Sequence, residues 1–235
     1  MTIAATTTAL GLAALSSDVQ FHRIPETERS ELVGQALLDG WCLAQRASQQ
    51  WGSDPFVVAA RCQVPIVESH SEAGFGSTVI YAEYAVSPPS ITLYAPAIRR
   101  LDALIARQSR FDLGIERTAP VFLAHELYHH FDCMRGKEAL IHRHRVSIVT
   151  LGRWTWTAGL STLPEIAAGA FAQELLGLSF HPKLLDVLVT HLTLTLSLLM
   201  GGEGSGHVGG VTERARFGNV PTKQDAVSDC DVKPN

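Results

Sequence analysis

The chain has 235 residues, of which 46% are hydrophobic and 18% are charged, a balance typical of a globular protein with a substantial core. Its formal net charge of −4 argues against nucleic acid or an anionic membrane as a partner of the whole chain. The four cysteines contain no C-x-x-C pair, so neither a disulfide framework nor a zinc knuckle is expected. We therefore expect a cytoplasmic protein that binds no nucleic acid and no membrane, with its oligomeric state left open.

The two ends of the chain differ in composition from its middle. Residues 1–20 are rich in Ala and Thr and lack the Lys or Arg that a secretory signal carries ahead of its apolar stretch, so we expect a flexible leader. Residues 201–235 start with a Gly-rich run and continue as a polar tail, which is expected to be disordered. One domain over residues 21–200 is the resulting prediction.

Helices and short strands are predicted between these ends. Apolar residues recur at helical spacing over 25–51, and short β-branched and aromatic segments, separated by Gly and Pro, follow as strands. The predicted strands cover 64–67, 78–84 and 90–94, with a strand pair, or a strand and a loop, over 142–157. The further predicted helices cover 97–108, 120–132, 164–176 and 181–200. This order indicates an α+β fold with a small antiparallel or mixed sheet packed against helices.

The hydrophobic stretch 184–200 is the only other candidate for a membrane span. It is short for that purpose and contains Asp186 and His191. A buried helix is therefore the favoured interpretation.

The helix predicted over 120–132 carries the pattern H-E-x-x-H as His125, Glu126 and His129. Residues four apart lie on one face of an α-helix, so both imidazoles can bind one metal ion. Glu126 is then placed to act as general base on a water molecule whose pKa zinc lowers. Since the pattern also occurs by chance, two surface histidines beside a solvated glutamate are the alternative.

A catalytic zinc site has three protein ligands, so a third ligand is required. The extended pattern with a third histidine fails, because Asp132 and Arg135 stand where its Gly and its last His would be. The best candidate is Glu165, in the first turn of a predicted helix whose small residues Ala168 and Ala172 would allow close approach of another helix.

Two alternatives to this ligand assignment stay open. Thr162 and Glu165 also fit a capping box, in which the glutamate only satisfies the helix N-terminus. Glu174, further along the same predicted helix, is a second candidate ligand.

The segments HELYHHFD and PEIAAGAFAQELLGL together resemble the compact gluzincin metallopeptidases of the ImmA/IrrE-like group, over about residues 90–180. That group pairs H-E-x-x-H with a downstream helix carrying E-x-x-A. The resemblance implies a zincin-like fold whose sheet has an edge strand along the cleft. It also implies a zinc metallopeptidase that cleaves a peptide or protein, with Zn²⁺ on His125, His129 and Glu165. Larger gluzincins have Asp four residues after the glutamate, where this chain has Gly169.

Other side chains have weaker support. Asp132 could brace a ligating histidine or be a solvated residue at the helix end. His130 is expected to be exposed or capping, and His142 and His144 would share one face of a strand, either as a solvated face or as a rival metal site. The candidate donors to a developing oxyanion are Tyr81, Tyr84, Tyr94 and Arg143. Trp154 and Trp156 are expected to pack inside the protein.

Two further functions stay open beside the metallopeptidase. The chain could be a regulatory or interaction module that binds zinc with little turnover, or a non-catalytic helical protein in which the motif is accidental.

Overall fold

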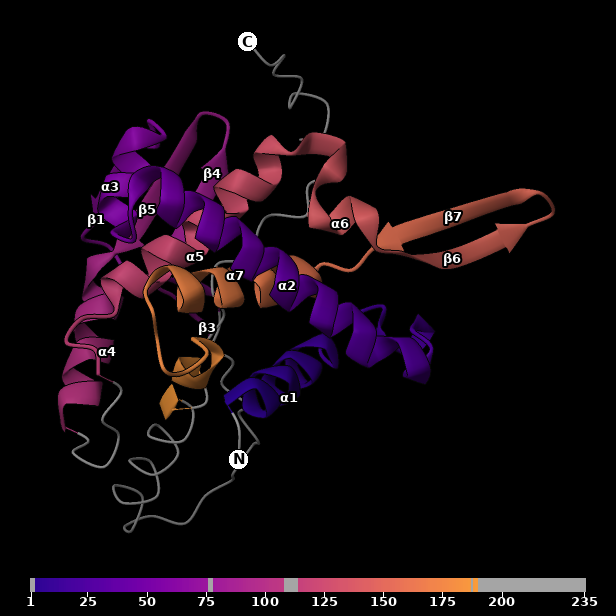
Figure 1. Cartoon of the computed structure of the whole chain (residues 1–235), viewed down its shortest axis with the longest axis horizontal. Coiled ribbons are helices and arrows are strands. Elements are labelled where there is room, and N and C mark those ends of the chain that lie inside the picture. Colours follow the sequence, from indigo (N-terminus) through magenta and orange to yellow (C-terminus); the bar gives the residue numbers. More distant parts are fainter. Residues whose placement is uncertain (1–2, 76–77, 108–113, 187, 190–235) are drawn as a thin grey trace.

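The computed structural model describes residues 3–75, 78–107, 114–186 and 188–189 (Figure 1). These residues form an α+β fold of helices, one three-stranded sheet and two smaller two-stranded sheets. In chain order the elements are α1 (Ile3–Leu15), η1 (Phe21–Arg23), α2 (Glu26–Trp51), α3 (Pro55–Arg61), β1 (Ile66–Ser69), β2 (Ala73–Phe75), β3 (Thr78–Ile80), β4 (Ala82–Val86), β5 (Pro89–Tyr94), α4 (Ala95–Arg107), α5 (Ala119–Met134), η2 (Gly136–Glu138), α6 (Leu140–Arg143), β6 (Arg145–Leu151), β7 (Trp154–Gly159) and α7 (Thr162–Leu175). None of the helices among these residues is both long enough and apolar enough to cross a membrane.

Helices α2, α7 and α5 pack in that order, with the three-stranded sheet beyond α5 (Figure 1). The crossing of α2 over α7 is close because Gly40 lies at the contact. A Cβ at this position would overlap the carbonyl oxygen of Ala167 and lie 2.9 Å from the backbone nitrogen of Phe171. Close approach lets the apolar faces of both helices enter one core, and it holds α7 tightly between its neighbours.

The three-stranded sheet has the order β1-β5-β4. Strand β1 is parallel to β5 and β4 is antiparallel to it, so β4 lies at an edge of this sheet. Strands β4 and β5 contact α5, and the rings of Tyr81 and Phe122 stack there with their centroids 4.6 Å apart. The edge strand therefore runs beside the helix that carries the H-E-x-x-H pattern.

Strands β6 and β7 form a hairpin that projects away from the packed helices (Figure 1). The pairing of the two strands shifts between Ser147 and Val149, which marks a bulge. Arg23 holds β6 at this bulge by donating to the carbonyl oxygens of Ser147 and Ile148, the latter at 2.8 Å.

The α+β prediction is confirmed, and so are the helix expected over 25–51 and the strand pair expected within 142–157. Residues 1–20, expected as a flexible leader, instead contain α1, and Leu15 at its end is fully buried. Helix α1 could not be predicted from periodicity, because its Ala, Thr and Leu residues show no separate polar face. Helix α3 was not predicted either, although Asp54 caps that helix and Pro55 begins it.

The hairpin region brings two further corrections. Residues 142 and 143 end the short helix α6, so His142 and His144 do not alternate along one strand. Trp154 and Trp156 are exposed rather than packed inside. The Gly-rich tail and most of the helix predicted over 181–200 lie outside the described residues.

Candidate metal and catalytic site

Helix α5 places its metal-binding pattern inside the protein. All residues from 121 to 130 are buried, since α5 is covered by α7 on one side and by the sheet on another. Tyr128, within the pattern, donates from its hydroxyl to Asp39 of α2 at 2.9 Å. The alternative of two surface histidines beside a solvated glutamate is therefore wrong, because His125, Glu126 and His129 are all buried.

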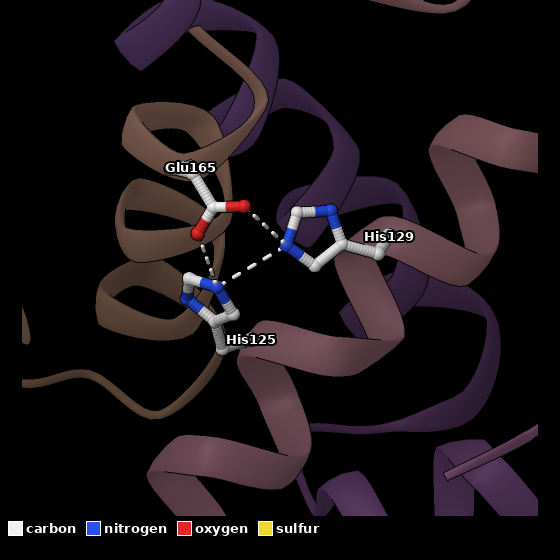
Figure 2. Close-up of side chains that lie close together, drawn as sticks. All are labelled: His125, His129 and Glu165. Carbon is white, nitrogen blue, oxygen red and sulfur yellow. Dashed lines mark hydrogen bonds and ion pairs between the residues drawn. The ribbon is translucent and has the colours of Figure 1, made fainter. Parts of the chain in front are cut away.

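Figure 2 shows His125 and His129 of α5 pointing at Glu165 of α7. The two Nε2 atoms lie 3.2 Å apart. Nε2 of His125 is 3.2 Å from one carboxylate oxygen of Glu165, and Nε2 of His129 is 3.4 Å from the other. One ligand atom from each of the three residues thus lies within 4.8 Å of the other two, a grouping that could hold a metal ion.

The first turn of α7 is fixed by a residue from the N-terminal segment. Asp18 accepts hydrogen bonds from the backbone N–H of Thr162 at 3.0 Å and from its hydroxyl at 2.8 Å. The capping box considered for Thr162 and Glu165 is therefore wrong, because Asp18 satisfies the helix start and the Glu165 carboxylate faces the two histidines. The other candidate ligand, Glu174, is exposed and accepts a hydrogen bond from Gln45.

Both histidines of the group favour the neutral form that binds metal. Burial, and to a smaller extent the nearby charge of Lys183, lowers the pKa of His125 to about 3. Burial also lowers the pKa of His129 to about 4, against the raising effect of the Glu165 carboxylate. Neutral imidazoles keep an unprotonated nitrogen for a metal at pH 7.

Glu126 occupies a separate position beside the group. It is 2% exposed, and the backbone N–H of Tyr84 on β4 hydrogen-bonds its carboxylate. Its Oε1 atom has no hydrogen-bond partner among the residues that the structure describes. Burial, together with the charge of Glu165, raises the pKa of Glu126 well above its ordinary value. Such a carboxylate has a raised proton affinity and an oxygen free to take a proton from a reactant.

Three polar residues after α7, missed by the sequence analysis, complete the surroundings. Lys183 and the largely buried Asp186 form an ion pair at 2.6 Å. The charge of Lys183 helps to lower the pKa of His125, and the charge of Glu165 helps to raise the pKa of Asp186. The buried His181 ring packs against Gly169, where a Cβ would lie 2.7 Å from its Nε2 atom and overlap its Cε1 atom. This packing explains why Gly169 stands one turn after Glu165. No motif marked these residues as part of a site, because they lie at or just before the start of the hydrophobic stretch 184–200.

Several weaker candidates have other roles. The Asp132 carboxylate accepts from the backbone N–H of Leu140 at 3.0 Å and pairs with Arg135, so it neither braces a ligating histidine nor lies in solvent. His130 is buried, in contrast to expectation, and its Nδ1 atom is 3.1 Å from the hydroxyl of Tyr84.

The four candidate oxyanion donors are likewise engaged with other groups. Tyr94 donates to Glu83 at 2.9 Å, Arg143 pairs with Asp39, and Tyr84 contacts His130 as described above. The Tyr81 ring stacks on Phe122. None of these contacts joins the His125, His129 and Glu165 group.

A scan against protein-family models and searches of curated proteins and of solved structures found no match to this chain.

Proposed function

We propose that this protein is a zinc-dependent hydrolase with a zincin-like fold, and that it acts as a metallopeptidase. The observation that carries the proposal is the convergence of His125, His129 and Glu165, with the buried Glu126 adjacent. Two imidazole nitrogens and one carboxylate form a ligand set typical of catalytic zinc, which leaves one position open for water or substrate.

The separations of the donor atoms fit a zinc ion. Zinc bonds of about 2.0–2.1 Å in tetrahedral geometry require donor atoms about 3.3–3.4 Å apart. The two Nε2 atoms are 3.2 Å apart, close to this spacing, and each of them lies within 3.4 Å of one of the two carboxylate oxygens of Glu165. Without a cation, the three contacts among His125, His129 and an ionised Glu165 cannot all be hydrogen bonds. If both Nε2 atoms carry a proton, two N–H groups face each other; if one of them lacks its proton, its contact with the carboxylate has no donor. The set therefore fits a metal better than a hydrogen-bonded cluster.

Zinc bound here would lower the pKa of a water molecule towards neutrality and polarise a substrate carbonyl. Glu126 would take the proton of that water as it attacks, and would then deliver the proton to the departing amine. The raised pKa of Glu126 suits both steps. It makes the carboxylate a stronger base towards the water, and it lets the protonated carboxyl persist to a higher pH, at which it can donate to the amine. The Tyr84 N–H keeps one oxygen in place while Oε1 carries the proton.

The position of β4 supports a peptide as substrate. This strand is at an edge of its sheet, and its Tyr84 N–H already points to Glu126. An extended peptide can add to such an edge by main-chain hydrogen bonds, which would bring a backbone carbonyl beside the metal group.

The Glu126→Gln variant tests the catalytic role. It removes the proton acceptor but leaves all three ligands, so we expect zinc content to be unchanged and peptide hydrolysis to fall by about 10²–10⁴-fold. The measurements are metal analysis of the purified protein and digestion of a broad peptide library. Glu174→Gln, an equal change on the exposed side of α7, is the control and should keep full activity.

A protein that binds zinc but cleaves no peptide, with or without Glu126, would support the regulatory zinc-binding module instead. A protein that binds no zinc at neutral pH would contradict both zinc functions.

A further inference from the structure

The β6–β7 hairpin has an apolar face that the rest of the described protein leaves uncovered. Val149 pairs with Trp156, and Leu151 pairs with Trp154, so these four side chains lie on the same face. They are between 51% and 69% exposed, and the two tryptophans are 65% and 57% exposed. Large side chains of this kind are rarely left together in water on an element that contributes little to the core.

The opposite face of the hairpin is polar. The hydroxyl oxygens of Thr150 and Thr155 are 3.3 Å apart, and Arg145 donates to the hydroxyl and the carbonyl oxygen of Thr157. The hairpin is therefore amphipathic, with a two-tryptophan face that points one way and a hydrogen-bonded face that points the other.

The charged residues of the hairpin itself have one sign. Residues 145–159 contain two arginines, Arg145 and Arg153, and no aspartate or glutamate, although the whole chain carries a net charge of −4. Arg153, in the turn between the strands, lies with its guanidinium carbon 5.8 Å from the centre of the Trp154 ring. A cationic tip beside exposed tryptophans is suited to a surface that offers both anionic groups and hydrocarbon.

We propose that the hairpin docks on an anionic lipid membrane, with Trp154, Trp156, Leu151 and Val149 entering the interface and Arg153 among the lipid phosphates. Tryptophan favours the boundary between headgroups and acyl chains, because its ring is apolar and its N–H remains hydrogen-bonded. Binding of this kind grows with the apolar area inserted and with attraction to anionic lipid. The proposal replaces the expectation of no membrane partner, which rested on whole-chain charge.

A second copy of the chain fits this face less well. A stable interface needs about 800 Å² from each partner. Two tryptophans at about 150–250 Å² each, with two aliphatic side chains, fall short of that area even when fully covered. The projecting shape of the hairpin also lets its tip reach a flat surface before the remainder of the molecule does (Figure 1).

The test is co-sedimentation of the full chain with vesicles of phosphatidylcholine alone and of equal parts phosphatidylcholine and phosphatidylglycerol. We expect binding to the anionic vesicles, with weaker binding at high salt. Trp154→Ser with Trp156→Ser should weaken it at least about tenfold, and Arg153→Ser about fivefold. Leu38→Ser with Phe56→Ser removes exposed apolar side chains outside the hairpin and should leave binding unchanged.

Circular dichroism checks that the double tryptophan variant folds. If that variant does not fold, Arg153→Glu, a single change in the turn, tests the same face and should weaken binding to anionic vesicles. No binding of the wild type to anionic vesicles would overturn the proposal, as would equal binding to neutral vesicles or full binding by the folded tryptophan variant. Sedimentation velocity without lipid tests whether the face instead binds a second copy of the chain. A dimer that the tryptophan changes dissociate would assign the face to a second copy and also overturn the proposal.

Discussion

At the scale of single residues, the ligand group depends on one carboxylate that reaches it from another helix. His125 and His129 share one face of α5 by virtue of their spacing alone. Glu165 meets them because Asp18 fixes the start of α7 and because α7 packs on α5. Its side chain is 33% exposed, whereas both histidines are almost fully buried, so the open position of a bound metal would be reached from the side of Glu165.

Glu165→Gln tests this ligand directly. A neutral amide replaces a charged ligand of similar size, so we expect zinc affinity to fall at least about 100-fold, beyond the 10–100-fold cost typical of outer-shell changes. Calorimetric titration of zinc into the metal-free protein measures the effect. Glu174→Gln is the matched control on the same helix, and equal affinities for the two variants would remove Glu165 from the ligand set.

His181 predicts a pH dependence of stability in the metal-free protein. Burial lowers its pKa from 6.5 to about 4, so between these values the unfolded chain binds a proton that the folded chain does not. Stability contributed by the neutral ring is therefore present above pH 6.5 and is lost as the pH falls towards 4, by about 1 kcal/mol per pH unit.

Urea unfolding of the wild type and of His181→Gln, at several pH values in this window, measures the difference. The free energy of unfolding of the wild type should fall more steeply with acid than that of the variant. Parallel curves would show that His181 is not held neutral in the folded protein.

At the scale of elements, the close crossing of α2 and α7 holds the glutamate helix in place. Gly40 allows this crossing, since a side chain there would meet the backbone of Ala167 and Phe171. Backbone atoms in two packed helices cannot move aside as the end of a flexible side chain can. The position of Glu165 thus depends on a residue of α2 far from the site in sequence.

Gly40→Ala should therefore destabilise the protein by about 1–3 kcal/mol, the usual cost of overpacking a tight contact. Gly34→Ala is the control, because it lies in the same helix and a Cβ there meets nothing within 4 Å. That variant should be stabilised by about 0.5–1 kcal/mol through helix propensity. Chemical denaturation measures the free energy of unfolding of both variants. Equal changes for Gly40→Ala and Gly34→Ala would show that the close crossing of α2 and α7 does not depend on Gly40.

At the scale of the whole molecule, the features that could be predicted from the sequence are those that local spacing decides. The periodicity of 25–51 predicted α2, and the four-residue spacing of His125 and His129 predicted a shared helix face. These two predictions needed only neighbours within a few turns of helix. Glu165 was proposed as a third ligand because a zinc site needs one and small residues follow the glutamate, and its carboxylate does lie beside the two histidines.

Features that depend on distant parts of the chain could not be predicted. The hydrogen bond from Tyr84 to Glu126 requires β4 to lie at a sheet edge beside α5. His181 lies against Gly169 because the chain turns back after α7. Trp154 and Trp156 were expected in the core because large aromatic residues usually pack there, and only the projection of the hairpin shows that they do not.

The account as a whole rests on zinc-dependent hydrolysis, and one measurement tests it most directly. Peptide-library cleavage is followed with the protein as purified, after zinc is removed by a chelator, and after one equivalent of Zn²⁺ per chain is restored. We predict that cleavage disappears with the metal and returns with it. Cleavage that continues once metal analysis shows no zinc, or no cleavage with one zinc bound per chain, would contradict the account.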